Sequence, residues 1–437
     1  FVGIGCLCLF FVLVFIGMPV GYTFASVGFL GFIAIRNFDQ ALKLLGYIPY
    51  SWASGYMLVV IPLFILMGQF AFYSGISAEL YRAAYAWLGR KPGGIALATQ
   101  LACTGFAACT GSSLASAATM GVVAIPEMKR YNYDSKLSTA TVVAGGTLGI
   151  LIPPSIMLVV MADQGSVSVG KLFAGAVIPG LILSTLYILY ILIRCYFKPQ
   201  DGPAISKEEL AAVSKGEIAL MVTKSLIPPM ILIMGVLGSI FMGVATPTEA
   251  AGVGAILAFI MTLAYGKFTW KGLITAVVNT ARTTSMVVLI LATASCFSSV
   301  FMGSGGGDVV QELILESGFG KWGMFIIMMV ILFFLGMFID WIGIILICFP
   351  LFLPIAADLG FDRIWFIVIM AVMLQDSFLT PPFGYALFYL KGVAPPEVST
   401  ADVYWGAFPF WRLMELGLII CVVWPESITW LPSLLIK

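Results

Sequence analysis

The chain has 437 residues, of which 61% are hydrophobic and 10% are charged, and its net charge is +1. Soluble domains carry about 25% charged residues, so this composition excludes a soluble globular protein and indicates a chain embedded in a lipid bilayer. The near-zero net charge gives no indication of nucleic-acid binding. Because the chain lacks histidine and has no HExxH or paired-carboxylate motif, the sequence also argues against an enzyme.

Apolar segments recur along the whole chain, and a helix needs about 17–25 such residues to cross a bilayer. The first segment is long enough for two short spans. In chain order the segments are 1–35, 59–73, 172–193, 227–243, 252–265, 324–339 and 413–424. We therefore expect an all-α polytopic membrane protein.

The chain contains an internal repeat. A shift of 228 positions superimposes four pairs of prolines: Pro19 on Pro247, Pro126 on Pro354, Pro153 on Pro381, and Pro154 on Pro382. At most one such coincidence is expected from the proline content. The sequence therefore predicts two homologous halves, 1–209 and 226–437, which the polar linker 198–225 connects.

Each half has the same order of predicted elements. Two spans are followed by an amphipathic segment (39–51 or 269–283), a third span, a pair of short apolar segments (about 96–127 or 322–357), a span broken at Pro-Pro, and a last span. Each short segment has about 15 residues and reaches roughly 22 Å, less than the ~30 Å hydrocarbon core. We expect these pairs to be re-entrant helical hairpins.

Five crossings then remain in each half, and an odd number places the second half in the opposite orientation to the first. Two inverted-topology repeats of this kind are typical of secondary transporters. The basic residues beside the first hairpin and in the linker place both in the cytoplasm by the positive-inside rule. The same count puts both chain ends outside.

Backbone that leaves the helix at membrane depth is tolerated only where it is buried in protein or lines a cavity. The predicted positions are two hairpin tips, 110–113 and 336–343, and two Pro-Pro breaks, 145–155 and 376–384. Pro-Pro frees carbonyl oxygens, which suit Na⁺, while helix N-termini suit a carboxylate or sulfonate. The alternatives are a simple kink and close helix packing. A helix N-cap is likewise the alternative role for Asp340, which aligns with Ser112, and for Asp376.

At these segments the chain resembles the large membrane subunit of the tripartite ATP-independent periplasmic (TRAP) transporters. The resemblance rests on 61–68 (IPLFILMG), 110–117 (TGSSLASA), 149–155 (GILIPPS), 245–251 (ATPTEAA) and 380–384 (TPPFG), and it covers essentially the whole chain. It implies a multi-pass protein of the bacterial inner (cytoplasmic) membrane that works as an elevator driven by Na⁺. It also implies two partners, a small four-helix membrane subunit (Q-type) and a soluble periplasmic binding protein that delivers a small organic anion.

The elevator needs a fixed scaffold and a moving transport domain. We expect the scaffold in 1–52 and 226–283 together with the last spans 172–197 and 403–424, and the transport elements in 56–162 and 284–390. The expected cargo is a carboxylate, a sugar acid or a sulfonate. The alternative is a carrier like the divalent-anion/sodium symporters, which works without a binding protein.

The candidate residues gather at the tips and breaks. At least two Na⁺ ions are expected, with candidate ligands Gly111, Ser112, Gly145, Thr147, Gly149 and Pro153 for the first, and Gly336, Asp340, Asp376, Ser377, Thr380 and Pro381 for the second. The candidate substrate-binding residues are Thr110, Ser112, Ser113, Ser155, Ser298, Ser299, Asp340 and Gly384.

Overall fold

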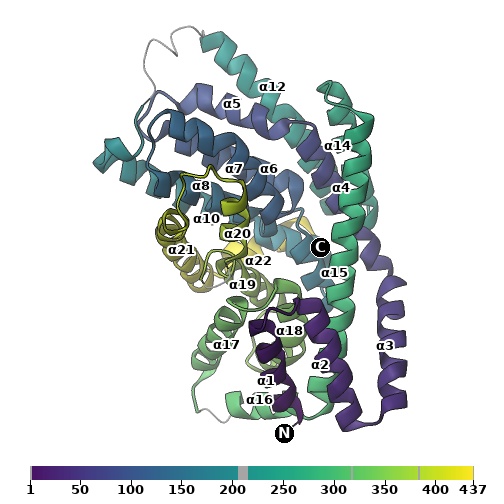
Figure 1. Ribbon diagram of the computed structural model, residues 1–437. Coiled ribbons are helices and arrows are strands. Elements are labelled where there is room, and N and C mark those ends of the chain that lie inside the picture. Colours follow the sequence, from purple (N-terminus) through teal and green to yellow (C-terminus); the bar gives the residue numbers. More distant parts are fainter. Residues whose placement is uncertain (1, 205–214, 316–317, 382–383, 437) are drawn as a thin grey trace.

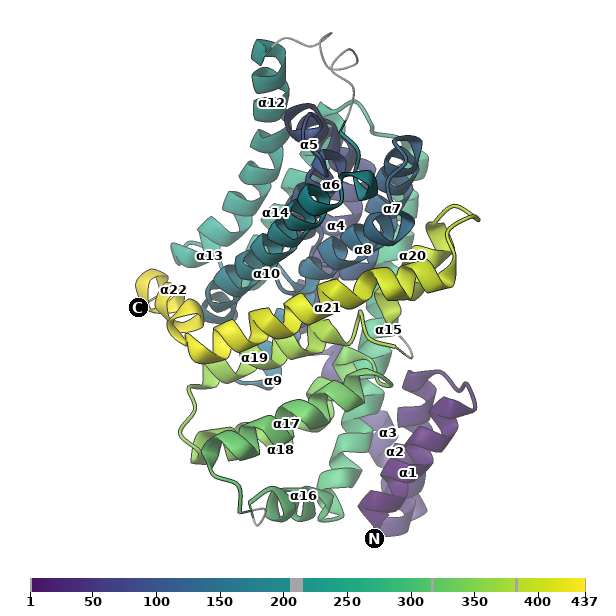
Figure 2. The ribbon, with the colours of Figure 1, turned by 90° about the vertical axis from the view of Figure 1, so that its left-hand side faces the viewer.

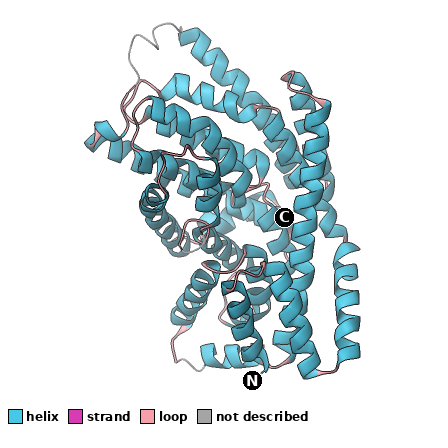
Figure 3. Cartoon of the chain, in the orientation of Figure 1, coloured by secondary structure: helices cyan, strands magenta, loops and turns pink. Residues whose placement is uncertain are grey.

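The computed structural model describes residues 2–204, 215–315, 318–381 and 384–436. All regular structure in these ranges is helical, as Figure 3 shows. Side-chain caps begin several of the helices. Ser112, Asp134, Ser155 and Ser168 each accept a hydrogen bond from a backbone N–H in the first turn that follows, as Ser and Asp commonly do at this position.

The described residues of the first half form ten α-helices. They are α1 (Val2–Phe15), α2 (Val20–Ile35), α3 (Phe38–Ala53), α4 (Val60–Tyr73), α5 (Ile76–Leu88), α6 (Gly94–Thr110), α7 (Ser113–Arg130), α8 (Ser135–Thr147), α9 (Ile156–Gln164) and α10 (Val169–Phe197). A 3₁₀ turn at Tyr56–Val59 separates α3 from α4, and another at Leu148–Ile150 extends α8 towards the first Pro-Pro break.

The second half follows the same order. Its helices are α12 (Lys215–Ile233), which continues through a π turn (Met234–Gly238) into α13 (Ser239–Phe241), then α14 (Pro247–Ala264), α15 (Trp270–Gly303), α16 (Gly306–Leu315), α17 (Lys321–Gly336), α18 (Trp341–Asp358), α19 (Arg363–Asp376), α20 (Tyr385–Val393), α21 (Thr400–Val423) and α22 (Glu426–Leu435). Residues Pro382 and Phe383 of the second Pro-Pro break lie outside the described residues.

The helix boundaries repeat at the offset found in the sequence. Helices α7 and α18 begin 228 residues apart and also end 228 residues apart. The first hairpin turns at Gly111 and Ser112, and the second turns between Gly336 and Trp341. Figures 1 and 2 place α6 and α7 in the upper part of the molecule and α17 and α18 in the lower part.

One element differs from the sequence expectation. The amphipathic segment 269–283 was expected to stand apart from the span after it, but both belong to the unbroken 34-residue helix α15. In the first half, α3 ends before Ser54 and Gly55, which separate it from the 3₁₀ turn and α4. Their repeat equivalents are Arg282 and Thr283, whose side chains permit a helix that Gly55 disfavours.

Six helices of the described chain are long and apolar enough to cross a membrane. The number rises to seven if α4 and α5, which are bent by 56° relative to each other, form one broken span. The five crossings expected per half would also require shorter helices such as α1 and α2, with 14 and 16 residues. The hairpin helices have 16–18 residues, more than the 15 expected. Helix α18 itself meets the length criterion, so length alone does not separate hairpin helices from spans.

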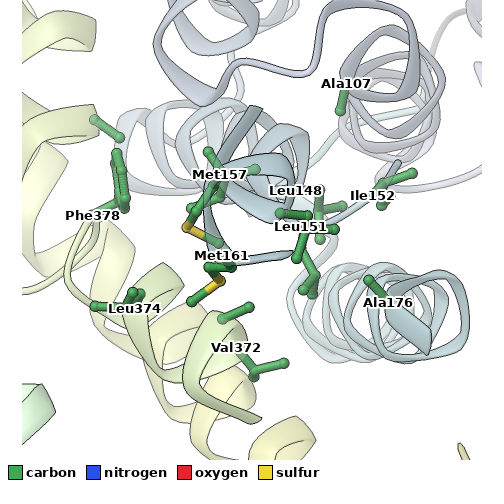
Figure 4. Close-up of a cluster of buried hydrophobic side chains, with 14 of the residues drawn as sticks. Ala107, Leu148, Leu151, Ile152, Met157, Met161, Ala176, Val372, Leu374 and Phe378 are labelled. Carbon is green, nitrogen blue, oxygen red and sulfur yellow. The ribbon is translucent and has the colours of Figure 1, made fainter. Parts of the chain in front are cut away.

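Two groups of helices pack within themselves. Helix α15 lies along α2 and α4, and α4 packs on α14, as the right-hand side of Figure 1 shows. Helices α6 to α10 and α17 to α21 form the other group, in which α21 packs on α8 and α10 packs on α19. Figure 4 shows a cluster of buried apolar side chains in this group, which contains Leu148 and Met157 from the first break and Phe378 from the second.

Candidate functional site

A cavity of about 380 Å³ lies where the two groups of helices meet. Its walls come from both hairpin tips (Gly111–Leu114 and Asp340–Ile342), from α15 and from the start of α2. Ile65 of α4 also lines it, together with residues of both broken helices: Ile150, Ile156, Met157, Phe378, Tyr385 and Tyr389. The fold therefore brings together the four non-helical segments that the sequence singles out. We call this space the central cavity.

The first tip is shaped by a glycine and a serine. Gly111 ends α6 with a positive φ of +62°, a conformation that costs a glycine little. The Ser112 hydroxyl accepts a hydrogen bond from Ala115 N at 3.4 Å and so caps α7. The tip fits closely on the first break, because a Cβ added to Gly149 would come within 2.9 Å of the Ser112 carbonyl oxygen. Carbonyl and hydroxyl oxygens thus gather beside the N-terminus of α7.

The second tip has a carboxylate at the equivalent position. Asp340 Oδ2 accepts a hydrogen bond of 3.1 Å from Ile342 N and caps α18, so the structural role considered for Asp340 is present. The same side chain also lines the central cavity. Gly336 lies directly against Ser377, and a Cβ on Gly336 would collide with the Ser377 hydroxyl. Each tip therefore packs on the helix break of its own half.

The second break contains buried polar atoms without a partner. Asp376 is fully buried, and within the described residues neither of its carboxylate oxygens has a hydrogen-bond partner. The Ser377 hydroxyl is in the same situation. A buried and unpaired carboxylate costs several kcal/mol, and a bound cation would remove this cost. The donor set of Asp376 and Ser377, made of hard oxygen atoms, fits Na⁺. Asp376 is not a helix N-cap, because it is the last residue of α19.

The electrostatics of the central cavity are set by few groups. Among the described residues that line the cavity, Asp340 is the one charged residue, and the N-termini of α7 and α18 both face the cavity. Helix N-termini carry partial positive charge and exposed N–H groups, which attract anions. An anion beside Asp340 would be repelled unless a cation neutralises that carboxylate. The arrangement suits an anion and a cation bound together.

The structure brings some predicted residues to the cavity and leaves others away from it. Of the candidate residues, Gly111, Ser112, Ser113 and Asp340 line it. Thr110 lies behind the first tip, with its hydroxyl 2.8 Å from that of Ser116. The hydroxyl of Ser155 bonds the Ile150 carbonyl and caps α9. Gly384 adopts a positive φ of +42° directly before Tyr385, which does line the cavity.

Ser298 and Ser299 are not brought to the central cavity. Ile290 is the last cavity residue of α15, and the continuous helix carries Ser298 about 12 Å further along its axis at 1.5 Å per residue. Ser299 is exposed and its hydroxyl bonds the Ser295 carbonyl at 2.8 Å. The sequence places these serines correctly in a helix but gives no information on which of its turns faces the tips.

The remaining candidate Na⁺ ligands belong to the breaks and are not among the described residues that line the cavity. Gly145 packs against Cys103 and Gln100 of α6, the close packing considered as its alternative role. The Thr147 hydroxyl donates to the Ala144 carbonyl at 2.8 Å. Pro153 is buried in the first break, the Thr380 hydroxyl donates to the Asp376 carbonyl at 3.1 Å, and Pro381 is exposed.

Aromatic and apolar residues of the lining were missed from the sequence. Trp341, Tyr385 and Tyr389 line the central cavity, and Met286 lines it from α15. Tyr385 and Trp341 directly follow the Gly384 and Asp340 already singled out, so the neighbours of each break were a usable signal. Met286 carries no such signal, because it comes from a different group of helices.

Comparison with known proteins gives a consistent result. A family model described as the DctM component of the tripartite ATP-independent periplasmic transporters matches residues 7–427. The C4-dicarboxylate TRAP transporter large permease protein DctM of Vibrio cholerae is 34% identical over 408 residues, which cover 88% of this chain and 87% of that protein. The isethionate TRAP transporter permease protein DctMQ of Oleidesulfovibrio alaskensis is 31% identical over 394 residues, 88% of this chain and 59% of that protein.

The fold also resembles a solved transporter structure. The YdaH transporter of Alcanivorax borkumensis superimposes with a TM-score of 0.61 at 14% identity, and the match covers 89% of each chain. At this identity the likeness concerns the fold alone.

Proposed function

Because this chain belongs to the DctM family of TRAP transporter components, we propose that it is the large membrane subunit of a secondary transporter that imports a small organic anion with a Na⁺ gradient. The observation that carries the proposal is the central cavity, where two helix N-termini and the carboxylate of Asp340 face the same space. The N-termini would hold a carboxylate or sulfonate, and Na⁺ would neutralise Asp340.

Sodium binding is supported by the oxygen atoms around the two breaks. The carbonyl of Ser112 lies against Gly149 in the first half. In the second half Gly336 lies against Ser377, next to the carboxylate of Asp376, which has no hydrogen-bond partner among the described residues. We propose one ion in each of these places. When bound, each ion would supply positive charge, while the chain's own carbonyls, hydroxyls and carboxylates would orient it.

The proposed anion can carry a carboxylate or a sulfonate group. The relatives named above transport a C4-dicarboxylate and isethionate, which carry carboxylate and sulfonate groups. Both groups suit helix N-termini, and a sugar acid would present the same carboxylate. Two partners complete the proposed system, a soluble periplasmic binding protein and a small four-helix Q-type subunit. The DctMQ relative is considerably longer than this chain, which fits a small subunit fused to it.

We propose that the transporter works as an elevator built from two inverted repeats in the bacterial inner membrane. The opposite positions of the two hairpins in Figures 1 and 2 support the inversion. The packing of the helices suggests a different division into scaffold and transport domain from the one expected from the sequence. The last spans α10 and α21 pack on α6, α8 and α19, so they would move with the hairpins.

The scaffold changes accordingly. Helix α4 packs on α14 and the unbroken helix α15 packs on α2, so α4 and all of α15 would remain with the scaffold. The predicted boundary between 283 and 284 falls inside α15, and a rigid helix cannot divide there. The scaffold unit is thus α1 to α4 with α12 to α15, and the transport unit is α6 to α10 with α17 to α21.

Uptake into proteoliposomes tests the proposal. The chain is reconstituted with its small subunit, and uptake of a labelled C4-dicarboxylate and of isethionate is measured with the cognate binding protein, under separate Na⁺ and H⁺ gradients. We expect uptake that requires Na⁺ and the binding protein and needs no ATP. Equal uptake without Na⁺ would refute the coupling. Na⁺-driven uptake without the binding protein would instead favour a carrier like the divalent-anion/sodium symporters.

A further inference from the structure

The two hairpin tips offer different chemistry to the central cavity, although they occupy equivalent repeat positions. Ser113 and Leu114 are the first two residues of α7, and both line the cavity. The first N–H groups of a helix have no partner within it, and these two make no hydrogen bond to the other described residues. The Ser113 side chain is 2% exposed, and its hydroxyl also lacks a partner within the described part of the chain. The start of α7 is therefore open to an acidic group.

The start of α18 is already occupied by the chain's own carboxylate. Asp340 accepts a hydrogen bond of 3.1 Å from Ile342 N, and Trp341 N lies within hydrogen-bonding reach of the same side chain. Trp341 and Ile342 are the repeat equivalents of Ser113 and Leu114. The N–H groups that are open in the first hairpin are thus satisfied in the second. Of the two helix starts, only that of α7 is left for an acidic group of a substrate.

The remaining walls of the cavity suit an uncharged and apolar body. The described residues that line the cavity include no lysine or arginine, and neither do the sequences of the two tips and the two breaks. Five described residues of α15 line the cavity, and all but Thr283 are apolar: Met286, Val287, Leu289 and Ile290. Aromatic rings line it from the second hairpin, the second break and α20: Trp341, Phe378, Tyr385 and Tyr389. A second acidic group would lose its hydration there without gaining a cationic partner, which is costly.

We infer that the imported anion carries a single acidic group on an apolar body, and that dicarboxylates and sugar acids are poor substrates. The inference rests on the proposed function and names the substrate class for its cavity. The acidic group would bind at the start of α7 beside Ser113, and the body would lie against α15 and the aromatic rings. Na⁺ at Asp340 would offset one negative charge, so a second acidic group would again leave a charge unbalanced.

The size of the cavity agrees with a small acid. Its volume of about 380 Å³ lies at the lower end of the range for ligand pockets, roughly 300–1,000 Å³. The position of the acidic group and the position of the body are set by different units, because Ser113 belongs to the transport unit and Met286 to the scaffold unit. The two parts of the substrate can therefore be tested separately.

Matched pairs of acids test the inference on the purified large subunit with its small subunit. Butyrate is compared with succinate, and phenylacetate with 4-carboxyphenylacetate, because the second member of each pair carries an additional carboxylate. Binding is measured as the acid concentration that gives half of the maximal rise in the thermal unfolding midpoint, in Na⁺ and in K⁺. In Na⁺ we expect each monocarboxylate to bind at least about tenfold more tightly than its dicarboxylate partner, and gluconate to bind more weakly than phenylacetate.

Two results would overturn the inference. In the first, a dicarboxylate or gluconate binds as tightly as the monocarboxylate with which it is compared. In the second, neither monocarboxylate gives a rise in the midpoint that depends on Na⁺.

Two variants at one position of the scaffold wall test where the body lies. Met286 lines the cavity and is 54% exposed. Met286→Arg places a cationic group against the proposed body, so it should raise the affinity for each dicarboxylate about tenfold relative to its monocarboxylate partner. Met286→Gln has a similar size and no charge, and it should not produce this change. An unchanged preference in Met286→Arg, or the same change in both variants, would overturn the placement of the body against α15.

Uptake separates the inference from the proposed function. Na⁺-driven uptake of both members of each pair is measured with the cognate binding protein. Uptake of the dicarboxylates that equals or exceeds that of the monocarboxylates would overturn the inference and leave the transport function standing. If the parent protein shows no Na⁺-driven uptake of any acid, the transport function is refuted on its own measurement, and the binding series still decides how many acidic groups the cavity accepts.

Discussion

Gln375 Nε2 donates a hydrogen bond of 3.1 Å to Thr147 Oγ1, and the two residues are 228 positions apart. They are therefore equivalent positions of the two repeats. When two equivalent residues touch, the axis that relates the repeats passes between them. Both side chains are fully buried at the ends of α8 and α19. The bond thus joins the two broken helices of the transport unit.

Removing this bond should destabilise the protein. Thr147→Val keeps the shape of the side chain but leaves Gln375 Nε2 buried without an acceptor, which costs about 1–3 kcal/mol. We expect a lower thermal unfolding midpoint in detergent. Thr147→Val combined with Gln375→Met should recover part of the loss, because both polar partners are then gone. The matched control is Thr185→Val, whose hydroxyl bonds Leu181 O on an exposed helix face, and which should change the midpoint little.

The charge of Asp340 can be tested apart from its capping role. Asparagine caps helices as well as aspartate does, so Asp340→Asn should preserve the start of α18 while removing the carboxylate from the central cavity. We expect uptake to be abolished, or the half-saturating Na⁺ concentration to rise about tenfold, which corresponds to roughly 1.4 kcal/mol. Ser112→Ala at the equivalent position should have a smaller effect, because backbone carbonyls supply much of the first site.

Asp362→Asn is the control for Asp340→Asn. Asp362 caps α19 through Trp365 N at 2.8 Å and does not line the central cavity, so its replacement should leave the Na⁺ dependence unchanged. Normal transport by Asp340→Asn with an unchanged Na⁺ affinity would show that Asp340 is only a cap. The proposed neutralisation of Asp340 by Na⁺ would then be wrong.

The sequence predicted the parts of the fold that local chemistry determines. Pro153 and Pro154, together with Gly111 and Ser112, interrupt the helices where the structure interrupts them, because proline and glycine act on their own backbone. What the sequence did not reveal depends on packing between distant segments. The continuity of α15, the association of α10 and α21 with the hairpins, and the lining by Met286 all depend on which helix faces lie against each other.

Movement between the two units is tested by a cross-link between them, because a Cβ on Gly343 would lie 2.7 Å from the ring of Phe24. Phe24 of α2 belongs to the scaffold unit and Gly343 of α18 to the transport unit, so joining cysteines at these positions with Hg²⁺ should stop uptake, and a reducing thiol should restore it. The control pair lies within the transport unit, where a Cβ on Gly121 would be 2.8 Å from Leu390. Gly121→Cys linked to Leu390→Cys should still transport. Full activity of the linked Phe24 and Gly343 variant would refute an elevator.

The contact between Gly336 and Ser377 can be tested by replacing this pair of residues with the equivalent pair of the first half. Their equivalents in the first half are Ala108 and Gly149, so each half has one glycine where the tip meets the break, but on opposite partners. Gly336→Ala alone places a methyl group in the space of the Ser377 side chain. This should push the second tip away from the break, lower the apparent Na⁺ affinity and destabilise the protein by about 1–3 kcal/mol.

Gly336→Ala together with Ser377→Gly recreates the pair found in the first half. The clash disappears, so the thermal midpoint should recover most of the loss. The Na⁺ affinity should recover only in part, because the double variant lacks the Ser377 hydroxyl, one of the unpartnered oxygens assigned to the second ion. Recovery of the midpoint without full recovery of Na⁺ affinity would separate the packing role of Ser377 from its role as a ligand. If Na⁺ affinity returned completely with the midpoint, Ser377 would act only through packing, and the second ion would have to be held without its hydroxyl.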